Sequence, residues 1–156
     1  MKYSIILSML IFFLASSCQD RYDPIQQHLD DIEEIEEYLE ENNLTGFQKT
    51  ESGVFYKILD EGEGEEHPSS TSSVNCDYIG LLIDDNRTYF DGGTKVDFPL
   101  TGVIKGWQDG IPKLKREGEG EFYIPSTLAY GNQSRGTIIG RNEILYFKIK
   151  LYHFWD

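Results

Sequence analysis

The side chains that usually carry enzyme chemistry are sparse and scattered in this chain. His28, His67 and His153 lie far apart, without the short spacings of metal ligands. The sequence has no GxSxG nucleophile motif, and Cys76 lies within an apolar stretch with no base beside it. We therefore expect no metal and no cofactor, and find little support for a hydrolase or a transferase.

A second group of residues consists of aromatic side chains placed beside turns. They occur in the segments CDYIG, YFDGG, VIKGW, LAYG and ILYFKIKL, and they are Tyr78, Phe90, Trp107, Tyr130 and Phe147. Taken singly, such residues are more often part of a hydrophobic core than of a ligand site. Asp91, just before Gly92-Gly93, would by itself suit a turn. A prediction that these residues form a site therefore rests on their order along the chain and not on any one of them.

The elements that would position these residues are mostly strands. Runs rich in β-branched and aromatic residues, bounded by glycine-rich turns, predict strands at 54–59, 74–82, 96–100, 121–124 and 144–154. A short helical patch is expected at 107–114. The pattern indicates an α+β domain, mainly antiparallel, at 50–156.

An amphipathic, acidic helix is predicted before this domain, at 25–45. Apolar residues recur every three or four positions, which places them in one stripe on a helix: Ile25, Leu29, Ile32, Ile35 and Leu39. Eight carboxylates between Asp30 and Glu41 are expected to cover its solvated faces. The apolar stripe must be buried either on the following domain or in a homodimer formed through residues 25–41.

The N-terminus has the features of an export signal. A lysine precedes an apolar run too short to span a bilayer comfortably, and the run ends in LASSC. This ending resembles a bacterial lipobox, which implies a lipoprotein signal peptide at 1–17, a lipidated Cys18 and a tether at 18–24. The alternative is an ordinary secretory signal followed by an incidental cysteine. The formal charge of −13 argues against a nucleic-acid partner, because phosphate binding requires clustered basic residues.

The ordered segments FPLTGVIKGW, FYIPSTLAYG and NEILYFKIKL resemble the FK506-binding-protein (FKBP) family of peptidyl-prolyl cis-trans isomerases. The likeness extends over about residues 54–154, and is greatest to the bacterial envelope branch related to the macrophage infectivity potentiators. It implies a five- or six-stranded antiparallel sheet wrapped around a short helix, with a ligand groove between them. It also implies a lipid-anchored protein of the cell envelope that faces the periplasm or the cell exterior.

The resemblance further implies roles for individual residues. Trp107 would form the floor of the groove, and Asp91 would be its one carboxylate. The Tyr130 hydroxyl and the Ile104 N–H would donate hydrogen bonds to a substrate carbonyl. The walls would come from Tyr78, Phe90, Val103, Ile104 and Phe147, and the overhanging loop from Ile138 and Ile139.

These roles correspond to an isomerase that acts on proline-containing unfolded or extended polypeptides, with FK506-like macrolides as further ligands. The alternative is a binding module or chaperone with the same fold and little turnover. Several positions depart from the family pattern. The stretch 91–98 is shorter than in well-known members, and Val96 stands where many members carry an aromatic residue. The usual groove arginine is missing, with Lys95 as a candidate substitute, Arg135 replaces a familiar histidine, and Gly140-Arg141 replaces a proline pair.

Overall fold

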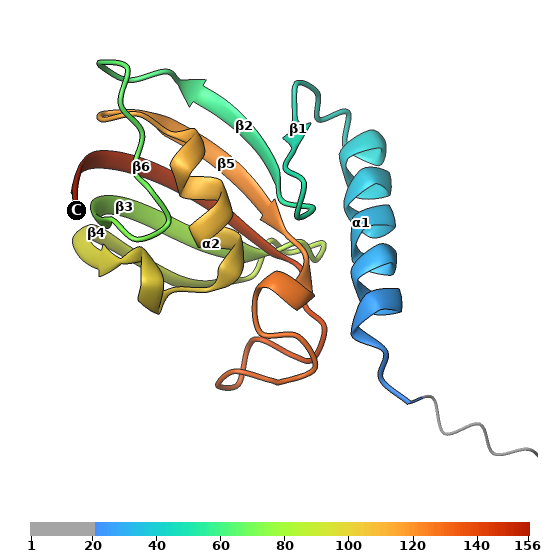
Figure 1. Ribbon diagram of the computed structural model, residues 1–156. Coiled ribbons are helices and arrows are strands. Elements are labelled where there is room, and N and C mark those ends of the chain that lie inside the picture. The colour runs from blue at the N-terminus through green and yellow to red at the C-terminus, as the bar shows by residue number, and fades with distance from the viewer. Residues whose placement is uncertain (1–20) are drawn as a thin grey trace, which may run out of the picture.

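The structure, a computed structural model, describes residues 21–156 (Figure 1). The predicted signal peptide, Cys18 and the first residues of the tether lie outside these residues. Within residues 21–156, no helix combines the length and the apolar character needed to cross a bilayer.

The centre of the fold is one six-stranded sheet in which all neighbouring strands are antiparallel. The strand order is β1-β2-β5-β6-β3-β4, so the C-terminal strand β6 lies inside the sheet between β5 and β3. The strands are β1 (Gln48–Lys49), β2 (Phe55–Asp60), β3 (Ser73–Leu82), β4 (Tyr89–Pro99), β5 (Glu119–Ile124) and β6 (Leu145–Trp155). With the short helix α2 (Lys105–Gly110), this confirms the predicted fold class.

The two faces of the sheet bury different sets of side chains, as the two-residue period of a strand requires. On one face, cross-strand neighbours surround the main core and α2: Tyr56, Phe122, Phe147 and Gly80. On the other face, a second row of neighbours faces the N-terminal helix: Phe55, Tyr123, Tyr146 and Leu81. The sheet is therefore covered on both sides (Figure 1).

Helix α2 lies close against the sheet, with the sheet curved around it (Figure 1). Gly106 permits this approach, because a Cβ there would collide with the side chain of Ile124 on β5. A 3₁₀ turn, η2 (Ile111–Lys113), continues the helix, and the buried side chain of Ile111 joins the main core. This packing fixes Trp107, which lies one residue after the glycine.

The N-terminal helix α1 runs from Pro24 to Glu41, so it begins one residue before the predicted segment 25–45 and ends four residues before the end of that segment. Asp23 caps its start, since its carboxylate accepts a 2.9 Å hydrogen bond from the Ile25 N–H, and proline suits the first turn. At the other end Asn42 is the C-cap and Asn43 adopts a positive φ of 53°. Asparagine tolerates that conformation better than most residues, which explains why the helix stops here.

Helix α1 packs on the sheet of its own chain, which settles where part of its apolar stripe is buried. Ile35 is fully buried and Leu39 nearly so, in a cluster with Phe55, Tyr123 and Tyr146. The other end of the stripe stays open, because Ile25 and Leu29 are 73% and 55% exposed.

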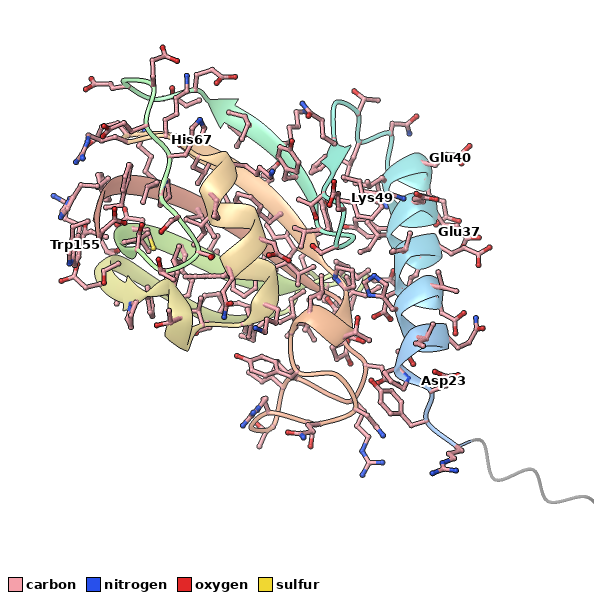
Figure 2. The ribbon with its side chains drawn as sticks, viewed as in Figure 1. Asp23, Glu37, Glu40, Lys49, His67 and Trp155 are labelled. Atoms are coloured by element: carbon pink, nitrogen blue, oxygen red, sulfur yellow. The ribbon has the colours of Figure 1, made fainter. Side chains whose placement is uncertain are left out.

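The polar side of α1 is mostly solvated, as predicted. Figure 2 shows Glu37 and Glu40 on the side of the helix that points away from the sheet. Lys49 of β1 reaches back to α1 and forms a 2.8 Å ion pair with Glu36. Asp31 is the exception, since its side chain is completely buried, which corrects the expectation that all eight carboxylates lie on solvated faces.

Candidate functional site

A cavity of about 260 Å³ opens between the sheet and α2. It is smaller than the roughly 300–1,000 Å³ sites that hold drug-sized ligands, so its size suits one or two residues of a peptide. The lining is mainly aromatic and aliphatic: Tyr78, Phe90, Asp91, Phe98, Gly102, Val103, Ile104, Trp107, Tyr130 and Phe147. We call this cavity the groove.

Trp107 lies deep in the groove, with only 4% of its surface exposed. Its ring stands at 83–84° to the rings of Tyr78, Phe98 and Phe147, with centroids 5.1–5.3 Å away. Edge-to-face packing of this kind holds each ring in one orientation. The indole Nε1 is buried and has no hydrogen-bond partner among the described residues.

One side of the groove depends on a glycine that sequence reasoning missed. The pairing of β3 and β4 shifts beside Gly80, and the extra residue on β4 is Phe90. A Cβ on Gly80 would lie 2.6 Å from Phe90 Cζ and 3.0 Å from Phe147 Cε1. The absence of that atom lets the two rings pack edge to face at 5.5 Å.

Phe98 forms another part of the wall, and it was not among the predicted site residues. A second shift between β3 and β4 occurs next to Tyr78, where Lys95 adopts a positive φ of 50° and donates its N–H to Asp77 at 2.6 Å. Phe98 then lies 5.5 Å from the ring of Tyr78. It supplies an aromatic wall that Val96 does not.

Lys95 does not replace the missing groove arginine. Its Nζ lies 5.3 Å from the ring centroid of Tyr152, and it is not among the residues that line the groove.

The polar groups of the groove are few. Asp91 is exposed, and its carboxylate accepts a hydrogen bond from the Gly92 N–H at 2.8 Å. Burial, and to a lesser extent the nearby Asp91 carboxylate, raises the pKa of Tyr78 to about 12. Its hydroxyl therefore stays protonated at neutral pH. Ile104 is the N-cap of α2. Its N–H therefore takes no part in the hydrogen bonds within the helix.

Tyr130 reaches the groove from the turn that follows η3 (Ser126–Leu128). The Arg135 guanidinium stacks on its ring at 5.0 Å, where the sequence departs from the expected histidine. Arg135 and Ile139 pair their backbones in a tight loop. Ile139 is nearly buried in the main core and Ile138 is 45% exposed, and neither lines the groove.

The structure thus brings eight of the predicted site residues together around one cavity: Tyr78, Phe90, Asp91, Val103, Ile104, Trp107, Tyr130 and Phe147. Their roles stay predictions, as does the role of Ile138 and Ile139. Within the described part of the chain, no group of three or more His, Cys, Asp or Glu side chains is arranged to hold a metal ion. The arrangement can enclose an apolar ring and present a few polar groups at its edge.

Comparison with known proteins gives one consistent result. The family profile described as "FKBP-type peptidyl-prolyl cis-trans isomerase" matches residues 64–152. The chain is 45% identical over 124 residues to a probable isomerase FkpA of Neisseria meningitidis, covering 76% of this chain and 44% of that protein. It is 39% identical over 104 residues to the "Outer membrane protein MIP" of Legionella longbeachae, covering 64% and 43%.

The structures agree with the sequences. The crystal structure of FkpA from Escherichia coli superposes with a TM-score of 0.69 at 30% identity, covering 84% of this chain and 62% of that chain. The chain spans about half the length of the curated relatives it matches.

Proposed function

Because this chain belongs to the FKBP-type peptidyl-prolyl cis-trans isomerase family, we propose that it catalyses the cis–trans rotation of X–Pro peptide bonds in exported polypeptides. The observation that carries the proposal is the groove itself, which is floored by Trp107, walled by aromatic rings and bordered by one carboxylate. Such a site needs no nucleophile and no cofactor to act on an amide bond.

The physical basis lies in the amide. Resonance gives the C–N bond partial double-bond character and a rotation barrier of about 18–20 kcal/mol. In the twisted transition state that resonance is lost, and the carbonyl becomes less polar. A dry aromatic cavity therefore accepts the twisted amide more readily than the planar one, which prefers water on its carbonyl.

The residue roles follow from their places in the groove. Trp107 and the surrounding rings would hold the prolyl ring, and the Tyr130 hydroxyl and the Ile104 N–H would donate to the substrate carbonyl. Asp91, next to the Tyr78 hydroxyl, would keep that ring in place at the open edge.

The direct test uses residues 20–156 and short peptides with an apolar residue before proline. We expect cis–trans exchange faster than in the buffer blank, measured by protease-coupled release or by NMR exchange. Uncatalysed exchange takes roughly 10–100 s at 25 °C, so even modest catalysis is measurable. A folded sample that matches the blank while still binding proline peptides would identify a binding module instead.

We also propose an envelope location and a lipid anchor on Cys18. The support is LASSC at the end of the apolar run, together with the outer-membrane name of the Legionella relative. Several acyl chains give stable anchoring, whereas one binds only marginally. Intact mass of membrane-extracted protein should show a chain that starts at Cys18 and carries lipid, and a Cys18→Ser variant should lose both features. An unmodified thiol at a different mature N-terminus would reject the anchor.

A further inference from the structure

The turn that carries Tyr130 is tied to α1 by a buried carboxylate. Asp31 Oδ2 accepts hydrogen bonds from the Ser126 N–H at 2.8 Å and from the Ser126 hydroxyl at 2.6 Å. Its other oxygen accepts from Gln27 Nε2 at 2.7 Å. Burying a carboxylate is costly unless hydrogen bonds compensate, and here three of them do.

Ser126 connects this carboxylate to both sides of Tyr130. Its carbonyl accepts hydrogen bonds from the Ala129 N–H at 2.9 Å and from the Gly131 N–H at 2.7 Å. These are the residues immediately before and after Tyr130. Ser126 is therefore hydrogen-bonded to α1 through its own N–H and hydroxyl, and to the Tyr130 turn through its own carbonyl.

From these contacts we propose that Asp31 is a positioning residue for the groove, which holds the Tyr130 hydroxyl in place through Ser126. The inference rests on the proposed isomerase function. Under this proposal α1 contributes to the function of the groove, although it lies outside residues 64–152, which match the family profile. Small displacements of a group that contacts a reacting substrate cost rate, so a rigid support for Tyr130 has a catalytic effect.

Asp31 is not needed merely to dock α1. The apolar cluster around Ile35 and Leu39 already fixes the helix to the sheet. His28 adds a second polar contact beside it, with Nδ1 2.6 Å from Thr127 Oγ1. The specific contribution of Asp31 is its pair of bonds to one serine.

The test compares Asp31→Asn with Asp30→Asn in the chain that carries the isomerase activity. Asp30 is the matched control, because it is the neighbouring carboxylate, is exposed, and accepts only from Gln26 Nε2. We expect kcat/KM to fall about two- to tenfold in Asp31→Asn, mainly through kcat, and to stay unchanged in Asp30→Asn. Ser126→Ala, which removes only the hydroxyl, should give a smaller loss in the same direction.

A double-mutant cycle separates positioning from general destabilisation. In a Tyr130→Phe background there is no hydroxyl left to position. Asp31→Asn should therefore lower kcat/KM little or not at all in that background. An equal loss in both backgrounds would overturn the proposal.

Hydrogen exchange gives a readout that does not depend on activity. The Ala129 and Gly131 amides should exchange faster in Asp31→Asn than in the parent, and equally fast in Asp30→Asn and the parent. A parent that does not accelerate isomerisation would defeat the proposed function, yet the exchange rates would still report on the Tyr130 turn. Unchanged exchange at both amides would overturn the role of Asp31.

Discussion

Replacing Trp107 by leucine should lower both the stability and the activity of the protein. The indole makes three edge-to-face contacts, each of which contributes about 0.5–1.5 kcal/mol beyond burial. Leucine keeps part of the apolar contact, and it also removes a buried N–H that has no partner among the described residues, a group whose burial costs about 1–3 kcal/mol. The opposing effects leave an expected loss of roughly 1–3 kcal/mol in the free energy of unfolding.

The activity should fall as well, because the floor of the groove disappears. We expect kcat/KM to fall more than about tenfold, with KM rising as peptide binding weakens. The free energy of unfolding should be followed in urea by far-UV circular dichroism, since Trp107 is one of only two tryptophans and its removal changes the fluorescence. Cis–trans exchange should be measured on the same preparations.

Trp107→Phe is the matched comparison, because it keeps an aromatic ring and deletes the N–H. It should retain most of the parental kcat/KM. If Trp107→Leu were as active as the parent, the groove would not be the site of rotation. If Trp107→Phe fell as far as Trp107→Leu, the N–H rather than the ring surface would be the important feature.

Four further outcomes are expected. Tyr130→Phe deletes one hydrogen bond and should lower kcat/KM by roughly tenfold or less, and a greater loss than in Trp107→Leu would reverse the assigned roles. Asp91→Ala leaves the apolar cavity and should lower kcat more than it raises KM, and unaltered kinetics would remove Asp91 from the site. Burial foremost, with nearby carboxylates, raises the pKa of Cys76 to about 12, so iodoacetamide at pH 8 should label it only on unfolding, and fast native labelling would contradict its placement. Partial burial, and to a lesser extent nearby carboxylates, raise the pKa of Glu34 above 4.5, so its charge destabilises the fold increasingly as pH rises from 4.5 to that raised value and by a constant amount above it. Because the Glu34 side chain is also open to solvent, which screens its charge, Glu34→Gln should add at most ~0.5 kcal/mol at pH 7 and nothing well below pH 4.5, and a gain that is independent of pH would disprove this reasoning.

Local patterns predicted most of the strands but not their irregularities. The strong alternation of 74–82 and of 144–154 corresponds to β3 and β6, which the structure places one residue away or less at each end. β1 was not predicted because a strand of two residues is too short to show an alternation of apolar and polar side chains. β4 begins well before the predicted 96–100, at Tyr89, because two glycines and two register shifts break its alternation.

The same irregularities explain the site residues that were missed. Phe98 and Gly80 owe their places to shifts in the β3–β4 pairing, and a count along one strand cannot show a shift in its partner. Asp31 was assigned to a solvated face because its neighbours are acidic, and only the fold reveals Ser126 beside it. The family resemblance predicted which aromatic residues line the groove, whereas the contacts that hold their rings in place could be seen only in the structure.

The central place of β6 has a consequence for how the molecule is made. Without β6, the strands of residues 21–156 form two groups, β1-β2-β5 and β3-β4, with no strand pairing between them. β6 is also the last of the six strands along the chain, so the sheet cannot close until the other five strands have been synthesised. Contacts between distant parts of a sequence slow folding, and unpaired edges are exposed to aggregation in the meantime. Until β6 pairs, the facing edges of β5 and β3 stay open, so a partly synthesised chain should aggregate more readily than the finished fold.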